Sequence, residues 1–324
     1  MDRPGALAQP VHRITAAVTT FATTYLPDAE SWCVALSGGP DSLALTAAAA
    51  RVLPTTALIV DHGLQANSAD VAEVARRQAL LLGCVDAKVL AVQVGTAGGP
   101  EAAARAARYG ALADARNGVP VLIGHTLDDQ AETVLLGLGR GSGPRSISGS
   151  RAFDPPWCRP LLQVRRAETE AACAELGIAT WRDPHNTDPR FTRVRLRTEV
   201  LPLLEEVLGG GVAEALARTA AALQEDADVL DAMAAQAFGE ATGGDSLDTG
   251  SLVPLPPAIR RRVIRTWLLG AGATALSDKQ LRAVDALVTE WRGQGGVAVG
   301  AGLPRERLFA ERRHGVLTLR RERV

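Results

Sequence analysis

Ser37-Gly38-Gly39-Pro40-Asp41-Ser42 connects a predicted strand to a predicted helix. The apolar run Trp32–Leu36 before it is typical of a buried strand, and the alanine-rich run Leu43–Val52 after it is typical of a helix. The two glycines let the backbone approach a ligand closely, and the N–H groups of the first helical turn attract negative charge. The sequence therefore predicts an anion site between this strand and this helix.

Strands and helices alternate on both sides of this turn. Apolar runs predict strands at residues 32–36, 56–60, 88–94 and 119–123, and helices are predicted at 11–25, 43–52, 68–82, 100–118 and 127–138. Right-handed βαβ units of this spacing build a parallel, doubly wound α/β sheet, in which ligands bind beyond the carboxyl ends of the strands. We therefore expect Ser37–Ser42, Asp61-His62 and Gly124–Asp129 to converge on one crevice.

A second, smaller domain is predicted after Gly209-Gly210-Gly211, which gives a catalytic domain of residues 1–208 and a mainly helical, basic domain of residues 209–324. Helices are predicted at residues 212–238, 259–269 and 278–291, with strand-like segments in the last 30 or so residues. Within the first domain, the glycine- and serine-rich segment Gly137–Gly149 is predicted to be a mobile loop over the crevice, carrying Arg140 and Arg145.

The composition is that of a soluble globular protein, with 47% apolar and 22% charged residues among 324. The chain has no run of about 18 apolar residues, so no membrane span is expected. The four cysteines are scattered and form no C-x-x-C pair, and the first ten residues lack the pattern of a signal peptide. Reduced thiols in a cytoplasmic protein are therefore expected.

The charge is unevenly distributed along the chain. Residues 257–324 contain 13 arginines and 1 lysine against 6 acids, whereas residues 212–248 contain 8 acids and one arginine. A basic end of this kind suits an anionic macromolecular partner. A solvated, arginine-rich surface explains the same residues equally well, and the charge alone does not decide between the two.

An acidic segment begins the helix that follows the fourth strand. Asp128, Asp129 and Glu132 lie within five residues, and the spacings of three and four place both aspartates on a face shared with Glu132. Carboxylates in this arrangement can bind Mg²⁺ or an amine. They can equally serve as negative charges that favour the helix dipole.

Taken together, the motifs resemble those of the tRNA(Ile)-lysidine synthase family, whose members are PP-loop ATP pyrophosphatases. The segments that carry the resemblance lie between about residues 30 and 205: Ser37–Ser42, Asp61–Leu64, Ala104–Tyr109, Gly124–Thr133, Arg140–Gly143, Arg159–Leu162, Asp183–Asp188 and Arg193–Arg197. This chain has His185-Asn186 where the family usually has Ser-Asn, and Arg193-Val194 where it usually has Arg-Asn.

The resemblance implies a two-step ligation. ATP adenylates the wobble cytidine of a tRNA(Ile) with the anticodon CAU, and L-lysine then displaces AMP to give lysidine. It also implies roles for individual residues: ATP binding by Ser37, Gly38, Gly39, Pro40, Asp41 and Ser42; Mg²⁺ binding by Asp41; steadying of the α-phosphate by Arg105 and His125; lysine binding by Asp129 and Glu132. A homodimer is a further implication of the resemblance.

The tRNA is larger than the crevice, so basic residues outside it are expected to contact RNA phosphates. Arg140, Arg145, Arg260 and Arg261 are the candidates. Trp267 and Trp291 suit base stacking, although packing in a core is the commoner use of tryptophan. Two other functions fit the sequence less well. A tRNA-thiolating PP-loop enzyme needs catalytic cysteines, often in C-x-x-C, and a non-catalytic RNA-binding module is expected to lose acids such as Asp41.

Overall fold

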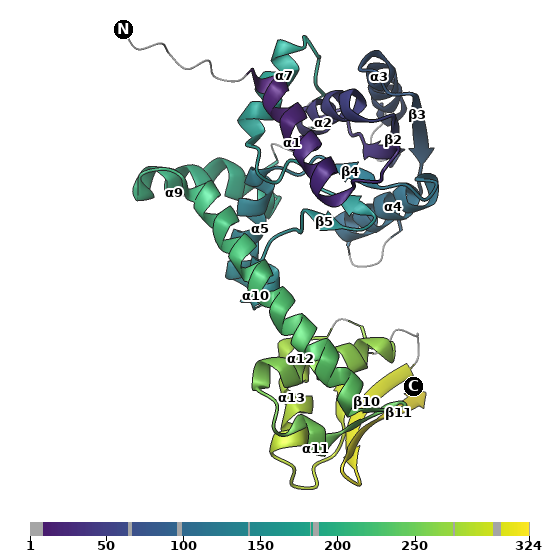
Figure 1. The fold of residues 1–324 in the computed structure, drawn as a ribbon, viewed down its shortest axis with the longest axis vertical. Coiled ribbons are helices and arrows are strands. Elements are labelled where there is room, and N and C mark those ends of the chain that lie inside the picture. The colour runs from purple at the N-terminus through teal and green to yellow at the C-terminus, as the bar shows by residue number, and fades with distance from the viewer. Residues whose placement is uncertain are drawn as a thin grey trace. The chain divides into compact units, whose positions relative to one another are not determined.

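The structure is a computed structural model that describes residues 9–63, 67–95, 99–141, 143–181, 183, 188–274, 276–300 and 306–323 (Figure 1). His185 and its neighbours at 184–187 lie outside the described residues. The chain divides into two compact units, residues 1–221 and 222–324. Among the described residues, no helix is both long and apolar enough to cross a membrane.

The first unit is built on a six-stranded sheet with the order β3-β2-β1-β4-β6-β5. Its strands are β1 (Trp32–Ala35), β2 (Thr55–Asp61), β3 (Asp86–Ala91), β4 (Val121–Ile123), β5 (Phe153–Asp154) and β6 (Trp157–Cys158). All neighbours pair in parallel except β5 and β6. The chain winds from β1 to β2 and β3 on one side and returns to β4 on the other, so the switch point lies between β1 and β4. The predicted doubly wound parallel sheet is confirmed.

Helices cover both faces of this sheet (Figure 1). The helical segments of this unit, in chain order, are α1 (Pro10–Tyr25), α2 (Pro40–Val52), α3 (Ser68–Leu81), α4 (Pro100–Ala115), α5 (Leu127–Arg140), α6 (Pro144–Ile147), α7 (Arg166–Glu175), α8 (Thr192–Arg195), a π-helical turn (Leu196–Val200) and α9 (Leu201–Leu208). Side chains alternate across a strand, so Val34 faces the core that α1, α2, α3 and α7 share, and Cys33 faces Leu112 of α4. Burial on both faces explains why the strands are apolar runs.

The predicted loop at Gly137–Gly149 is wrong at its start. Helix α5 continues to Arg140, and Pro144–Ile147 forms the short helix α6. The reason is a close contact between backbones: a Cβ atom at Gly137 would lie 2.6 Å from the carbonyl carbon of Ser146. Glycine at this position thus belongs to helix packing and not to a mobile segment.

The second unit combines helices with an antiparallel sheet. Helix α10 (Val212–Ala241) begins in the first unit and ends in the second; α11 (Thr249–Leu252), α12 (Pro257–Gly270) and α13 (Asp278–Thr289) follow. The strands β7 (Thr242–Gly243), β8 (Ser246–Asp248), β9 (Val297–Val299), β10 (Glu306–Arg313) and β11 (Val316–Arg323) pair in the order β7-β8-β11-β10-β9. The predicted helices are present, and the strand-like segments near the end form the centre of this sheet. The predicted boundary at Gly209–Gly211 stays a prediction.

The contact at Gly137 gives a test of helix packing. We expect Gly137→Ala to lower the free energy of unfolding by about 1–3 kcal/mol, because the added methyl group overlaps the Ser146 backbone. Gly139→Ala in the same helix meets no atom within 4 Å and should raise it by roughly 0.5–1 kcal/mol. Urea denaturation of the two variants measures both effects, and equal effects would contradict the packing explanation.

Candidate active site

The predicted anion-binding turn has the expected geometry. Strand β1 ends at Ala35 and α2 begins at Pro40, with Gly38 at φ +81°, a conformation that favours glycine. The Ser37 N–H donates to Ser42 Oγ at 3.2 Å, and Ser42 Oγ donates to the Gly39 carbonyl at 2.9 Å. These bonds hold the turn against the start of α2, where backbone N–H groups lack helical partners. The turn therefore suits an anion such as a phosphate.

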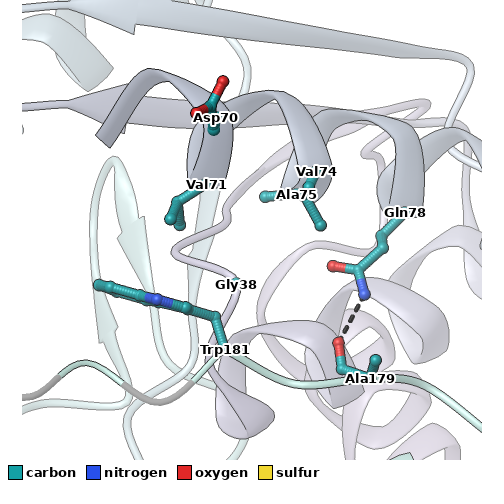
Figure 2. Close-up of a pocket in the computed structure, with 8 residues that line it drawn as sticks. All are labelled: Gly38, Asp70, Val71, Val74, Ala75, Gln78, Ala179 and Trp181. Atoms are coloured by element: carbon teal, nitrogen blue, oxygen red, sulfur yellow. Dashed lines mark hydrogen bonds between the residues drawn. The ribbon is translucent and has the colours of Figure 1, made fainter. Parts of the chain in front are cut away.

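A small pocket lies on the α3 side of this turn and has a different character (Figure 2). Its volume is about 170 Å³, and its walls are Val71, Val74 and Ala75 of α3 and the ring of Trp181. The backbone N–H of Trp181 donates to the Gly38 carbonyl at 2.9 Å, which holds this residue beside the turn. The lining is apolar almost throughout, so this pocket does not supply the charges that hold phosphates.

The end of β4 approaches the turn directly. A Cβ atom at Gly124 would lie 3.1 Å from the backbone carbon and oxygen of Asp41 and from the N of Ser42. Only glycine allows this approach without a shift of the backbone. It brings His125 and the start of α5 next to the turn, so the expected convergence of Ser37–Ser42 and Gly124–Asp129 is confirmed. The convergence of Asp61-His62 on the same crevice stays a prediction.

The acids at the start of α5 face different partners. Asp129 Oδ2 accepts from the backbone N–H and the hydroxyl of Thr126 at 2.8 and 2.9 Å, which caps the helix. Glu132 has no solvent exposure and accepts from Arg197 Nε at 2.7 Å. Asp128 points elsewhere: it accepts from the Arg166 backbone N–H at 2.7 Å and pairs with Arg165. Asp129 and Glu132 therefore form a pair, and Asp128 does not belong to it.

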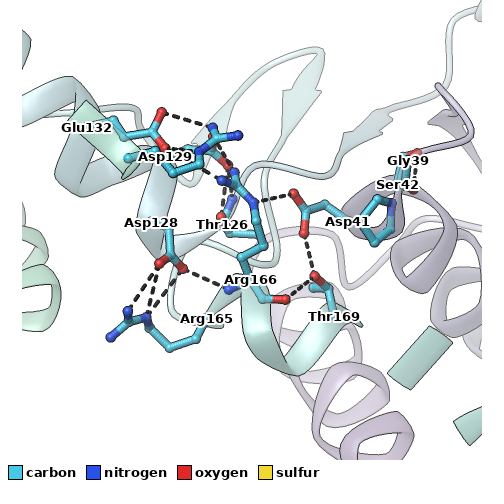
Figure 3. A network of polar contacts seen from close by, with 12 residues as sticks. Gly39, Asp41, Ser42, Thr126, Asp128, Asp129, Glu132, Arg165, Arg166 and Thr169 are labelled. Atoms are coloured by element: carbon cyan, nitrogen blue, oxygen red, sulfur yellow. Dashed lines mark hydrogen bonds and ion pairs between the residues drawn. The ribbon is translucent and has the colours of Figure 1, made fainter. Parts of the chain in front are cut away.

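A single arginine connects these acids to the turn (Figure 3). Arg166, the first residue of α7, donates from Nε to Asp41 Oδ2 at 3.0 Å and from Nη2 to Asp129 Oδ1 at 2.9 Å. Its Nη1 lies 3.5 Å from Glu132 Oε1. Thr169, one turn further along α7, donates its hydroxyl to Asp41 Oδ1. The guanidinium of Arg166 thus lies among three carboxylates for which the family resemblance implies roles: Asp41 for Mg²⁺, and Asp129 and Glu132 for lysine.

The electrostatics of this cluster follow from burial and from Arg166. Burial alone would lower the pKa of Arg166, but Asp129, Asp41 and Glu132 together raise it above its usual value. Burial alone would raise the pKa of Asp129, but Arg166, His125 and the Thr126 hydrogen bonds lower it. Burial raises the pKa of Asp41 despite its bonds to Arg166 and Thr169. The ionised form of Asp129 is therefore better supported by its neighbours than that of Asp41.

His125 lies beside this cluster as a neutral imidazole. Burial lowers its pKa to about 4; Asp129 opposes this shift, and Arg159, Arg108 and Arg105 add to it. Its Nδ1 is buried and has no hydrogen-bond partner among the described residues. Arg105 on α4 is exposed and lies 4.8 Å from the centre of the Tyr109 ring. A neutral histidine beside the turn suits a contact to a phosphate.

Comparison with known proteins agrees with this geometry. Residues 10–204 match the PP-loop domain family, and residues 247–318 match the TilS substrate binding domain. The tRNA(Ile)-lysidine synthase of Mycobacterium tuberculosis (strain ATCC 25618 / H37Rv) is 67% identical over 100% of both chains. That of Mycobacterium leprae (strain TN) is 64% identical over 98% of both. The chain belongs to the tRNA(Ile)-lysidine synthase family.

The similarity to solved structures concerns the fold. The U34-tRNA thiolase NcsA from Methanococcus maripaludis has a TM-score of 0.54 and 18% identity, and the match covers 67% of this chain and 80% of that one. Members of the lysidine synthase family are ATP-using enzymes that modify tRNA, so the sequence-based assignments of family, fold class and enzyme class are confirmed.

The basic residues predicted to contact tRNA differ in exposure. Arg140 and Arg145 are exposed, at the end of α5 and in α6. Arg260 in the second unit is 6% exposed and donates to Asp285 at 2.5 Å and to the Leu255 carbonyl at 2.8 Å. A guanidinium committed in this way is not available to RNA, which argues against the contact expected for Arg260. The side chain of Arg261 is 29% exposed, and its Nη1 lies 3.8 Å from Asp285 Oδ2.

The two tryptophans of the second unit also differ. Trp267 is buried and donates from Nε1 to the Asp245 carbonyl at 3.0 Å, so packing in the core is confirmed for it. Trp291 is 39% exposed, and Arg312 lies 5.7 Å from its ring centre.

The role of Arg166 was not predicted from the sequence of this lysidine synthase family member. The only local signal is its place at a helix start after Arg159–Leu162.

The lowered pKa of His125 predicts a pH effect on stability. Between about pH 6.5 and 4 the unfolded chain binds the proton and the native protein does not, so the free energy of unfolding falls as the pH falls. His125→Gln should reduce this slope by up to roughly 1.4 kcal/mol per pH unit. Urea denaturation at several pH values measures the slopes, and NMR titration checks the pKa directly. Equal slopes in the two proteins would contradict the assignment.

Proposed function

We propose that the chain uses ATP to adenylate the wobble cytidine of CAU-anticodon tRNA(Ile) and attaches L-lysine to form lysidine, releasing AMP and pyrophosphate. One observation carries the proposal: an anion-binding turn and a pair of carboxylates suited to an ammonium group belong to one ion-pair network through Arg166. Adenylation by ATP needs the anion-binding turn, and an amine substrate needs the pair of carboxylates. The names of the family relatives agree with this reaction.

In the first step, the C2 oxygen of cytidine attacks the α-phosphorus of ATP and the bond to the β-phosphate oxygen breaks. Pyrophosphate leaves, and we propose that Ser37–Ser42 hold it through backbone N–H groups and hydroxyls. Arg105 contributes positive charge at the α-phosphate. His125, neutral because its pKa is about 4, contributes a hydrogen bond without a charge.

In the second step, the ε-amine of lysine attacks C2, the C2–oxygen bond breaks and AMP leaves. We propose that Asp129 and Glu132 bind the lysine ammonium group before this step. The lowered pKa of Asp129 keeps it ionised at neutral pH, which favours binding of a cation. The attacking amine has to be neutral, so a proton must pass from the ammonium group to a base near C2.

The side chain of Asp41 fits Mg²⁺ as a single carboxylate ligand. Its Oδ1 accepts from Thr169 and its Oδ2 from Arg166, and each oxygen keeps a further lone pair. Mg²⁺ is commonly bound by one or two carboxylates together with substrate phosphates and water. When bound, the ion supplies neutralisation of phosphate charge. The homodimer and the cytoplasmic location stay predictions from the sequence.

Incorporation of labelled L-lysine into CAU-anticodon tRNA(Ile), with ATP, tests the reaction. Elongator tRNA(Met) has the same anticodon and serves as the control for substrate choice. We expect Asp129→Asn to raise the KM for lysine at least tenfold while leaving adenylation in place, because the amide keeps an acceptor for Thr126 and loses the charge. Asp114→Asn, at an exposed site on α4, should leave incorporation unchanged. A folded protein that incorporates no lysine would refute the proposal.

The second unit is proposed to contribute phosphate contacts through Arg261. Arg261→Gln should weaken tRNA binding and reduce the slope of log affinity against log salt by about one. Arg260→Gln should instead destabilise the unit, because it leaves the buried Asp285 without its main partner. Binding titrations at several salt concentrations, together with thermal unfolding, separate the two. An unchanged slope in Arg261→Gln would show that Arg261 makes no phosphate contact and is an ordinary solvated surface residue.

A further inference from the structure

The two carboxylates proposed for lysine are already bound by arginines. Arg166 donates to Asp129 at 2.9 Å and lies 3.5 Å from Glu132. Arg197 holds Glu132 through Nε at 2.7 Å and Nη2 at 3.1 Å. An ammonium group donates three hydrogen bonds to acceptors, and these oxygens are the acceptors at this place. Lysine and the guanidinium of Arg166 therefore compete for the same oxygens.

Arg166 is the member of this group that also contacts the anion-binding turn. Its Nε bonds to Asp41, the second residue of α2, whose first turn forms the predicted phosphate site. Arg197, in contrast, forms ion pairs only with Asp129 and Glu132 of α5 among the described residues. Arg166 therefore stands between the phosphate half and the lysine half of the site.

From this position we infer that Arg166 couples ATP binding to lysine binding. The triphosphate, bound at Ser37–Ser42, draws the guanidinium from Asp129 and Glu132 towards phosphate oxygens, and the released oxygens then receive the lysine ammonium group. Phosphate suits this exchange, because guanidinium binds phosphate and carboxylate with the same paired geometry. The inference rests on the proposed function for its two ligands.

The partial burial of the cluster makes the exchange of cations important for the free energy of binding. The side chain of Arg166 is 16% exposed and that of Glu132 is not exposed at all. When Arg166 moves away, Arg197 still holds Glu132, but Asp129 loses its hydrogen bond from Arg166 and both acids lose a nearby cation. This loss is costly for partly and fully buried carboxylates until another cation replaces the guanidinium. Binding of the triphosphate and binding of lysine should therefore favour each other. Thermodynamic linkage requires the factor to be the same in both directions.

Equilibrium dialysis of labelled L-lysine with the full chain tests the coupling. Mg²⁺ and saturating CAU-anticodon tRNA(Ile) are present throughout, with or without an ATP analogue that has a methylene bridge between the α and β phosphates and so blocks adenylation. We expect lysine to bind at least tenfold more tightly with the analogue, within the usual range of coupling between sites. Adenosine in place of the analogue should leave the affinity at its lower value, because the phosphates draw Arg166.

Variants at the start of α7 assign the effect to Arg166. In Arg166→Gln, lysine should bind more tightly without the analogue, and the tenfold ratio should fall below about three. Arg166→Lys keeps the charge but not the span of a guanidinium, and it should give an intermediate ratio if the glutamine variant does not fold. Arg165→Gln is the matched control and should keep the full ratio, because Arg165 contacts Asp128 and Glu214 instead. Loss of packing alone would weaken binding in both arms without changing the ratio.

Three results would overturn the inference: a ratio near one in the unmodified protein, a full ratio in Arg166→Gln, or the same rise with adenosine. No lysine binding in either arm would contradict both the inference and the proposed lysine site. Failure of the incorporation assay with the coupling intact would contradict only the proposed reaction, so the two proposals fail separately.

Discussion

The guanidinium of Arg166 binds carboxylates that are far apart in the sequence. Asp41 lies 125 residues before it, and Asp129 lies 37 residues before it. Three acids brought this close together repel one another, and Glu132 is fully buried, so a cation among them is a condition of the arrangement. The start of α2, the start of α5 and the start of α7 therefore depend on one another through this side chain. Asp128 adds a second link between α5 and α7, because its carboxylate accepts a hydrogen bond from the backbone N–H of Arg166.

Much of the fold was predictable because its signals are local. The apolar run at Trp32–Leu36 and the glycines after it determine a strand and a turn from a few neighbouring residues. The alternation of strands and helices then determines the sheet type. The same reasoning brought Ser37–Ser42 and Gly124–Asp129 together, because parallel strands end at the same edge.

The residues that were missed or misjudged depend on contacts at long range. Arg166 is one of 35 basic residues, and nothing next to it in the sequence marks its three partners. Arg260 is different, because a local signal exists. It is spaced three and seven residues from Val263 and Trp267, which places it on the buried face of α12. Both Arg260 and Arg261 were predicted to contact RNA phosphates, whereas helical periodicity separates Arg260 from its neighbour.

The three arginines recorded against Glu132 are Arg166, Arg193 and Arg197. With Asp41 and Asp129 included, three cations face three carboxylates, so this group of six side chains carries no net charge when all are ionised. Each substrate alone disturbs this balance, since a triphosphate brings excess negative charge and lysine brings an excess ammonium group. On binding, the arginines exchange carboxylates for phosphate oxygens, and the carboxylates exchange arginines for the lysine ammonium group.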